Sequence, residues 1–137
     1  MPPKAQPKPR SLKQTVTLPC SPAEAYELLM SSRKHAAFTD HPAKISTKLG
    51  GKVSAYDGYI EACNLELKPG KKIVQAWRTR EWPAGWFSKA TWTFAKAKGG
   101  TKLVFTQTQI PAFDYADLKA GWVEHYWDRM KAYLAGS

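Results

Sequence analysis

Hydrophobic and polar residues follow two successive patterns in the first quarter of the chain. Over residues 12–18, a mainly apolar set that includes Gln14 alternates with lysine and threonine, and this period of two predicts a half-buried β-strand. Ser21 then precedes Pro22, and Glu24 lies three residues after the serine, an arrangement typical of a capped helix start. We therefore expect a short helix after the first strand and a second short helix over residues 32–38.

Turn residues divide the middle of the chain into short, strand-like runs. Asp57-Gly58 predicts a two-residue hairpin turn, and Pro69-Gly70 suits a type II turn. Glycine pairs at Gly50-Gly51 and Gly99-Gly100 mark two further turns. Consecutive strands joined in this way form an antiparallel meander. The predicted strands are Ala43–Lys48, Lys52–Tyr56, Tyr59–Leu67, Lys72–Arg80, Phe87–Ala95 and Thr101–Gln109.

The last part of the chain has the period of a helix. Residues 114–134 contain few helix breakers and would form a helix about 30 Å long. Its apolar stripe is wide and must be covered, and the sheet is the only element large enough to cover it. We therefore predict an α+β fold in which about six to seven antiparallel strands form a curved sheet, with the long C-terminal helix across its concave face. The stripe comprises Trp122, Tyr126, Met130 and Tyr133, widened by Val123, Trp127 and Leu134.

Alternation within the strands also predicts which side chains face the helix. The inward-facing residues of three strands are mainly apolar with one polar member each, as in the walls of small-molecule pockets. The same side chains suit an ordinary core, and the two glutamines could instead lie in water near an end of the sheet. The inward-facing sets are Ile73, Gln75 and Trp77; Ser88, Ala90, Trp92 and Phe94; and Leu103, Phe105 and Gln107. The candidate ligand-binding residues are Gln75, Trp77, Trp92, Phe105, Gln107, Trp122 and Tyr126.

Signatures of catalysis and of metal binding are absent from the sequence. It contains no nucleophile elbow, no zinc-protease helix motif and no dinucleotide-binding glycine pattern. His35, His41 and His125 fall on separate predicted elements, so we expect no metal site. Glu61 and Glu66 are expected on opposite faces of one strand, which separates their carboxylates. We predict that the protein is not an enzyme and needs no cofactor.

Charge and cysteine content define the class of protein further. The formal net charge is +10, which suits acidic partners, although many basic domains gain only solubility from it. Residues 1–10 are basic and proline-rich, so we expect a disordered tail before a single domain over residues 11–137. Cys20 and Cys63 are expected to be reduced, no apolar run is long enough to span a membrane, and a cytoplasmic location follows. No recognised motif supports nucleic acid as the partner.

Several segments together resemble one known family. They are Gly50-Gly51, residues 57–60, residues 65–78, Trp82-Pro83, residues 100–103, Gln107, Pro111, Gly121-Trp122 and residues 125–127. These segments are similar to the C-terminal domain of the activators of the ninety-kilodalton heat-shock chaperone ATPase, which belong to the START-like, birch-pollen-allergen-like (SRPBCC) superfamily. The resemblance covers nearly all of residues 11–134 and implies a helix-grip fold. The tryptophan- and asparagine-rich motif of the activators' separate N-terminal domain does not occur in this sequence.

Two functions remain open from these observations. The first is a non-catalytic domain that holds a small hydrophobic ligand in a cavity between the C-terminal helix and the sheet, as superfamily members often do. The second, implied by the activator resemblance, is a domain that binds a heat-shock chaperone and modulates its ATPase. Candidate contacts for such a partner are Lys52, Lys71, Lys72, Arg78 and Arg80. Trp82 and Trp86, which flank a loop, suit either a pocket mouth or a protein contact.

Overall fold

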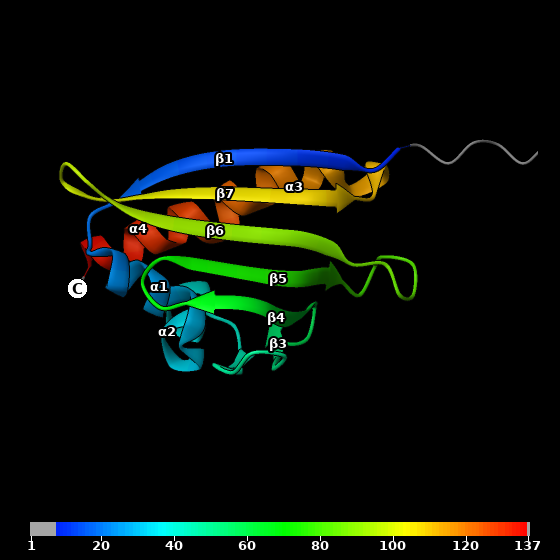
Figure 1. The fold of residues 1–137 in the computed structure, drawn as a ribbon, viewed down its shortest axis with the longest axis horizontal. Helices are drawn as coiled ribbons and strands as arrows, with labels where there is room; N and C mark the ends of the chain where they lie inside the picture. Colours follow the sequence, from blue (N-terminus) through cyan, green and yellow to red (C-terminus); the bar gives the residue numbers. More distant parts are fainter. Residues whose placement is uncertain (1–7, 137) are drawn as a thin grey trace, which may run out of the picture.

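The computed structural model describes residues 8–136, and within them seven antiparallel strands form a sheet (Figure 1). The strand order is β1-β7-β6-β5-β4-β3-β2, so the meander from β2 to β7 is extended at its end by the N-terminal strand. This order confirms the predicted antiparallel sheet. The strands are β1 (Arg10–Leu18), β2 (Lys44–Ile45), β3 (Lys52–Ala55), β4 (Ile60–Lys68), β5 (Lys72–Thr79), β6 (Ser88–Ala97) and β7 (Gly100–Ile110).

The helices in the described part of the chain lie on one face of the sheet and leave the other face uncovered (Figure 1). Two short helices follow β1, and a long helical segment follows β7 and crosses the sheet. This arrangement confirms the predicted helix-grip fold of the α+β class. The helical elements are α1 (Pro22–Met30), α2 (Ser32–Thr39), a 3-10 turn (Ala112–Asp114), α3 (Tyr115–Trp122), a π turn (Val123–Trp127) and α4 (Asp128–Ala135).

Side-chain caps define where the two short helices begin. The Ser21 hydroxyl accepts a hydrogen bond from the backbone N–H of Glu24 at 3.2 Å, as the capping pattern predicts. Ser31 caps α2 in the same way, accepting from the N–H of Lys34 at 3.2 Å. Helix α2 ends at Asp40, whose φ of +58° is a left-handed conformation that aspartate tolerates. Both short helices therefore have locally encoded limits.

The inner face of the sheet forms the core with the inward-facing residues that alternation predicts. Ile73 lies opposite Trp92, and Trp92 lies opposite Phe105 on the next strand, so one row of large side chains crosses β5, β6 and β7. All three are buried, and Phe105 is fully enclosed. Leu103 and Phe94 form the neighbouring row. The helices bury these rows against the sheet.

Two indole hydrogen bonds attach the C-terminal helical segment to the sheet. Trp122 Nε1–H donates to Gln107 Oε1 at 2.8 Å, and Trp127 Nε1–H donates to Gln14 Oε1 at 2.6 Å. A π turn winds more residues into each turn than an α-helix, so residues five apart come to the same side. The two tryptophan rings accordingly stack, with centroids 5.6 Å apart and planes at 18°. Val123, which we expected in the apolar stripe, is 42% exposed and therefore lies outside the packed face of the segment.

The β3–β4 connection is longer than the two-residue turn that Asp57-Gly58 suggested. Strand pairing ends at Ala55 and Ile60, which leaves a loop over residues 56–59. The backbone is left-handed at Tyr56, Asp57 and Gly58, with φ values of +50°, +56° and +88°. The two-residue prediction was wrong because Tyr56 also adopts a turn conformation. By contrast, Gly70 has a φ of +73° and Lys71 N–H bonds the Lys68 carbonyl, as a type II turn requires.

A β-bulge in β4 changes which face two acidic residues occupy. The register shifts between Asn64 and Glu66, so the intervening leucine is an extra residue. Glu61 pairs with Arg78 and Glu66 pairs with Val74, and these partners lie on the same, outer side of β5. The expectation that the two glutamates face opposite sides was therefore wrong, because an extra residue reverses the alternation of a strand.

Residues 1–7 of the expected basic tail lie outside the described residues. Strand β1 begins at Arg10, one position before the expected start of the domain. In residues 8–136, no helix combines the length and the apolar character needed to cross a membrane.

Replacing Gln107 with methionine is expected to destabilise the fold through the helix attachment. Gln107 accepts from Trp122 and donates to Ser88 Oγ at 2.9 Å, so Gln107→Met leaves a buried indole N–H without an acceptor. We expect the free energy of unfolding to fall by about 2–3 kcal/mol, measured by urea denaturation. Thr108→Met, at an exposed neighbouring position, is the matched control. Equal stability of the two variants would contradict the expectation.

Candidate functional site

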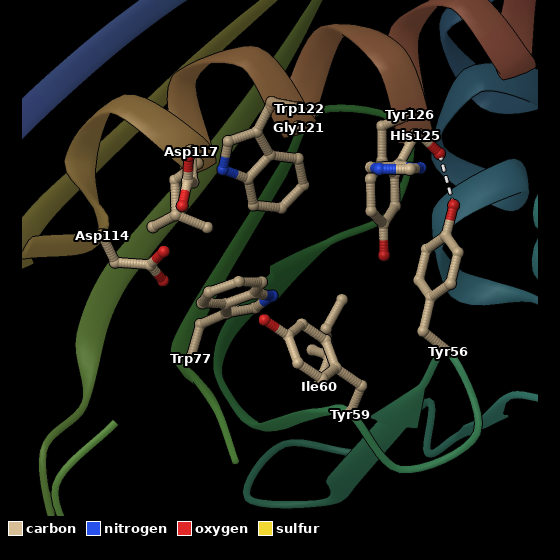
Figure 2. A pocket seen from close by; sticks show the side chains of 11 residues that line it. Tyr56, Tyr59, Ile60, Trp77, Asp114, Asp117, Gly121, Trp122, His125 and Tyr126 are labelled. Atoms are coloured by element: carbon tan, nitrogen blue, oxygen red, sulfur yellow. Dashed lines mark hydrogen bonds between the residues drawn. The ribbon is translucent and has the colours of Figure 1, made fainter. Parts of the chain in front are cut away.

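A pocket lies at the N-terminal end of the long helical segment, between α3, the π turn and the β3–β4 loop (Figure 2). Its volume is about 330 Å³, which is within the range of small-molecule sites. The lining residues are Tyr56, Tyr59, Ile60, Trp77, Asp114, Asp117, Leu118, Gly121, Trp122, His125 and Tyr126.

Aromatic side chains from three separate parts of the chain form most of the pocket wall. Tyr56 and Tyr59 come from the β3–β4 loop, Trp77 from β5, and Trp122 and Tyr126 from the helical segment (Figure 2). The ring centroids of Trp77 and Trp122 are 5.3 Å apart, and those of Trp122 and Tyr126 are 4.7 Å apart. Because the wall combines loop, sheet and helix, the pocket forms only when the domain folds.

Tyr56 connects the loop to the helix at one end of the pocket. Its left-handed φ of +50° is costly for a bulky residue, and such strain is often retained at functional sites. The side chain holds this conformation by donating its hydroxyl to the His125 carbonyl at 2.7 Å (Figure 2). Burial raises the pKa of Tyr56 to about 12, so the hydroxyl remains a donor near neutral pH.

Two carboxylates lie at the other end of the pocket. Asp114 is 7% exposed, and its Oδ2 accepts the indole N–H of Trp82 at 2.7 Å. Burial raises the pKa of Asp114; the Trp82 hydrogen bond opposes this shift, whereas the negative charges of Asp117 and Glu81 add to it. Trp82, which we expected at a pocket mouth or a protein contact, is instead buried behind Asp114 and positions its carboxylate.

A smaller void adjoins the pocket, and the buried His35 is one of the residues that line it. Its volume is about 20 Å³, and Trp77 and Tyr126 border both spaces. His35 Nε2 and the Tyr126 hydroxyl form a hydrogen bond of 2.9 Å. Burial lowers the pKa of His35 to about 4, so this imidazole is neutral at pH 7. The pair forms a neutral polar contact behind the aromatic wall.

The structure separates the predicted ligand-binding residues. Trp77, Trp122 and Tyr126 come together in the pocket wall. The others are buried away from it: Gln75 and Trp92 border the smaller void, and Phe105 and Gln107 lie in the packed core. Phe105 packs directly against Trp122, with ring centroids 4.3 Å apart, so this pair encloses no ligand space between its rings.

Sequence reasoning missed several residues of the pocket. Tyr56 and Tyr59 flank the Asp57-Gly58 turn signal, and a tyrosine on each side of a loop could have indicated a wall. Gly121, a glycine within a helical pattern, is a further signal of close approach or open space. Asp114 and Asp117 gave no signal, since acidic residues are ordinary in the first turn of a helix.

Within residues 8–136, no three His, Cys, Asp or Glu side chains are grouped as ligands for one metal ion. Cys20 and Cys63 are free thiols. The pocket therefore offers aromatic surfaces, two carboxylates and the exposed His125 as its recognition groups.

Comparison with known proteins gives this fold a family. Residues 19–135 match the family model described as Activator of Hsp90 ATPase homolog 1-like protein. The chain belongs to this family. The match covers every element after β1, from α1 to the end of α4, and it therefore includes the whole pocket.

Curated relatives in the activator family are longer than this chain. An activator of 90 kDa heat shock protein ATPase homolog from Dictyostelium discoideum is 36% identical over 130 residues, which are 94% of this chain and 34% of the relative. The human activator homolog 1 is 34% identical over 121 residues, 88% of this chain and 35% of the relative. The chain thus spans about a third of the length of the curated relatives it matches.

Solved structures show the same architecture. An HSP90 activator from Plasmodium falciparum superposes with a TM-score of 0.86 at 25% identity, covering 91% of this chain and 96% of that chain. A protein from Mesorhizobium loti has a TM-score of 0.79 at 15% identity, covering 93% and 98%, and this likeness shows the fold alone.

Acid is expected to destabilise the domain through His35. Because the folded-state pKa of about 4 is below the ordinary 6.5, the unfolded chain binds the proton first as the pH falls. The contribution of neutral His35 is therefore complete above about pH 6.5 and is lost between there and pH 4, a loss of roughly 3 kcal/mol. Urea unfolding at a series of pH values measures it. His35→Gln should flatten this dependence, whereas His41→Gln, at an exposed histidine, should not; an unchanged slope in His35→Gln would disprove the assignment.

Proposed function

We propose that this domain binds the ninety-kilodalton heat-shock chaperone and modulates its ATPase. The supporting observation is the family match over residues 19–135, together with the likeness to the Plasmodium falciparum HSP90 activator. That solved chain is matched over 96% of its length, so it has about the extent of this single domain. The longer curated relatives carry the same activator name.

The uncovered face of the sheet is the surface best suited to an acidic partner. Lys13, Lys89 and Lys102 project from β1, β6 and β7 on this face, opposite to the buried side chains of the same strands. Their cross-strand neighbours are mostly threonines. Among residues 8–136, no carboxylate forms an ion pair with any of the three lysines. Unpaired cations on an exposed surface create a positive field that accelerates association with an acidic protein.

The cations named from the sequence take different positions around this face. Lys52, Lys72 and Arg78 lie on outward-facing strand positions, whereas Lys71 and Arg80 lie in turns at opposite ends of β5. Glu66 partly neutralises Lys72 at 3.5 Å. Lys13, Lys89 and Lys102, which form no ion pair within residues 8–136, are therefore added to these candidates for contact with the chaperone.

Reversing two charges on the uncovered face is expected to weaken chaperone binding. We expect Lys89→Glu with Lys102→Glu to raise the Kd for the purified chaperone about tenfold or more, since each lost attraction becomes a repulsion. Biolayer interferometry at low and high salt measures binding, and chaperone ATP hydrolysis is followed in parallel. Arg33→Glu with Lys131→Glu, on helices α2 and α4, changes the net charge equally and should bind as the unaltered domain does. Absence of binding by the unaltered domain would refute the proposal.

The pocket supports a second function, the binding of a small apolar ligand. Its size and its mainly aromatic wall are typical of sites that enclose small molecules. A Cβ atom added at Gly121 would meet only His125 Cδ2, at 3.7 Å, so the glycine leaves open space along the helix. This pocket lies between the first half of the helical segment and the sheet, and the β3–β4 loop forms a further part of its wall.

Filling the space beside Gly121 is expected to abolish binding of a neutral probe. Titration with tert-butylbenzene should change the fluorescence of the wall tryptophans, and Gly121→Leu should remove the saturable change. Gly121→Ala is the matched control: the added methyl group fits, and replacing a helical glycine should raise the free energy of unfolding by about 0.5–1 kcal/mol. Saturable binding that survives in Gly121→Leu would place the probe elsewhere.

A further inference from the structure

The charge of the pocket is opposite to that of the protein. The chain carries a formal net charge of +10, yet the lining contains Asp114 and Asp117 and no lysine or arginine. A cavity lined by one sign of charge concentrates ligands of the other sign. An anionic ligand would meet these carboxylates without a balancing cation in the lining.

Asp114 is held in an orientation that serves the pocket and not the helix. It occupies the N-cap position of α3 but makes no side-chain hydrogen bond to the helix backbone. Its Oδ2 instead accepts from Trp82 Nε1 at 2.7 Å, and the carboxylate is directed into the pocket (Figure 2). A buried carboxylate with one short charge-assisted hydrogen bond is fixed in place, and its other oxygen remains available to a ligand.

The aromatic wall offers ring faces next to these carboxylates. Trp77 and Trp122 lie closest to the acidic end, and Tyr59 and Tyr126 continue the wall (Figure 2). A cation within about 6 Å of an aromatic centroid is attracted by the ring, and the attraction grows when water is excluded. One wall ring already has such a neighbour, since the Arg80 guanidinium lies 5.6 Å from the Tyr59 centroid.

We propose that the pocket binds a small organic cation, namely a quaternary or tertiary ammonium group attached to an apolar body. The ammonium group lies between Asp114, Asp117 and the ring faces of Trp77 and Trp122, and the apolar body extends toward Tyr56 and Ile60. Aromatic walls and a fixed carboxylate supply the two attractions that such a ligand needs, namely a cation–π contact and an opposite charge. A quaternary nitrogen has neither an N–H nor a lone pair, so it needs no hydrogen-bond partner from the pocket. This inference rests on the small-ligand function proposed for the pocket.

Two probes of the same shape separate charge recognition from apolar binding. Phenyltrimethylammonium and tert-butylbenzene differ in one atom, since a positively charged nitrogen replaces a quaternary carbon. Titrating the domain with each, and following tryptophan fluorescence, should give a Kd about tenfold or more lower for the cation. Gly121→Leu should abolish binding of both probes. Equal binding, or tighter binding of tert-butylbenzene, would overturn the cation inference while the apolar pocket stands; binding of neither would refute the pocket function itself.

Neutralising the carboxylates tests which groups supply the selectivity. Asp114→Asn keeps an oxygen that can accept from Trp82, so the fold is retained, and it should weaken phenyltrimethylammonium binding about tenfold with little effect on tert-butylbenzene. Asp117→Asn, at an exposed position, should act in the same direction. Glu27→Gln on α1 makes the same change in net charge far from the pocket and should leave both affinities unchanged. If both aspartate variants bind the cation as tightly as Glu27→Gln does, the inference is wrong.

Discussion

The buried hydrogen bond between the Trp122 indole and the Gln107 amide determines where the C-terminal helix lies on the sheet. Gln107 is fully buried, and its amide also donates to Ser88 Oγ, which in turn donates to the Trp77 carbonyl. The chain of donors and acceptors therefore runs from the helix across β7 and β6 to β5. Sliding the helix would leave several buried polar groups without partners, and each would cost about 1–3 kcal/mol. Hydrogen bonds between polar groups, and not apolar contact alone, therefore fix the position of the C-terminal helix along the sheet.

The π turn follows from a second attachment five residues further along. Trp127 bonds Gln14 on β1, and a regular α-helix would direct a residue five positions after Trp122 well to one side of it. The extra residue in the turn allows both indoles to face the sheet and to stack on one another. The same turn presents the His125 carbonyl to the Tyr56 hydroxyl. The pocket is thus bounded on one side by the segment that the two tryptophan bonds hold in place.

Local sequence signals predicted most of the fold, and the pocket could not be derived from them. Capping at Ser21 and the alternation around Trp92 are local properties, so the helix start and the inward face were confirmed. The bulge after Asn64 and the π turn depend on tertiary partners, and no single-strand pattern reveals an extra residue. The cavity was expected between the helix and the sheet with no position along the helix, and Phe105 fills part of that space against Trp122. Its real position depends on the Tyr56 loop reaching the helix, a contact across 69 residues of sequence.

The basic outer face and the acidic pocket lie on opposite sides of the sheet, and β5 and the loop after it connect them. Trp77 points into the pocket, whereas its neighbour Arg78 points outward and donates to the Trp82 carbonyl at 2.7 Å. The indole of Trp82 in turn holds Asp114. A partner that withdrew Arg78 from this carbonyl would act on the residue that positions the pocket carboxylate. Conversely, Trp82 is 3% exposed and tightly enclosed. A ligand that binds in the pocket without moving this tryptophan therefore leaves the contacts of the outer face unchanged. The two proposed binding functions are therefore physically separable, and Trp82 is the residue through which they could be coupled.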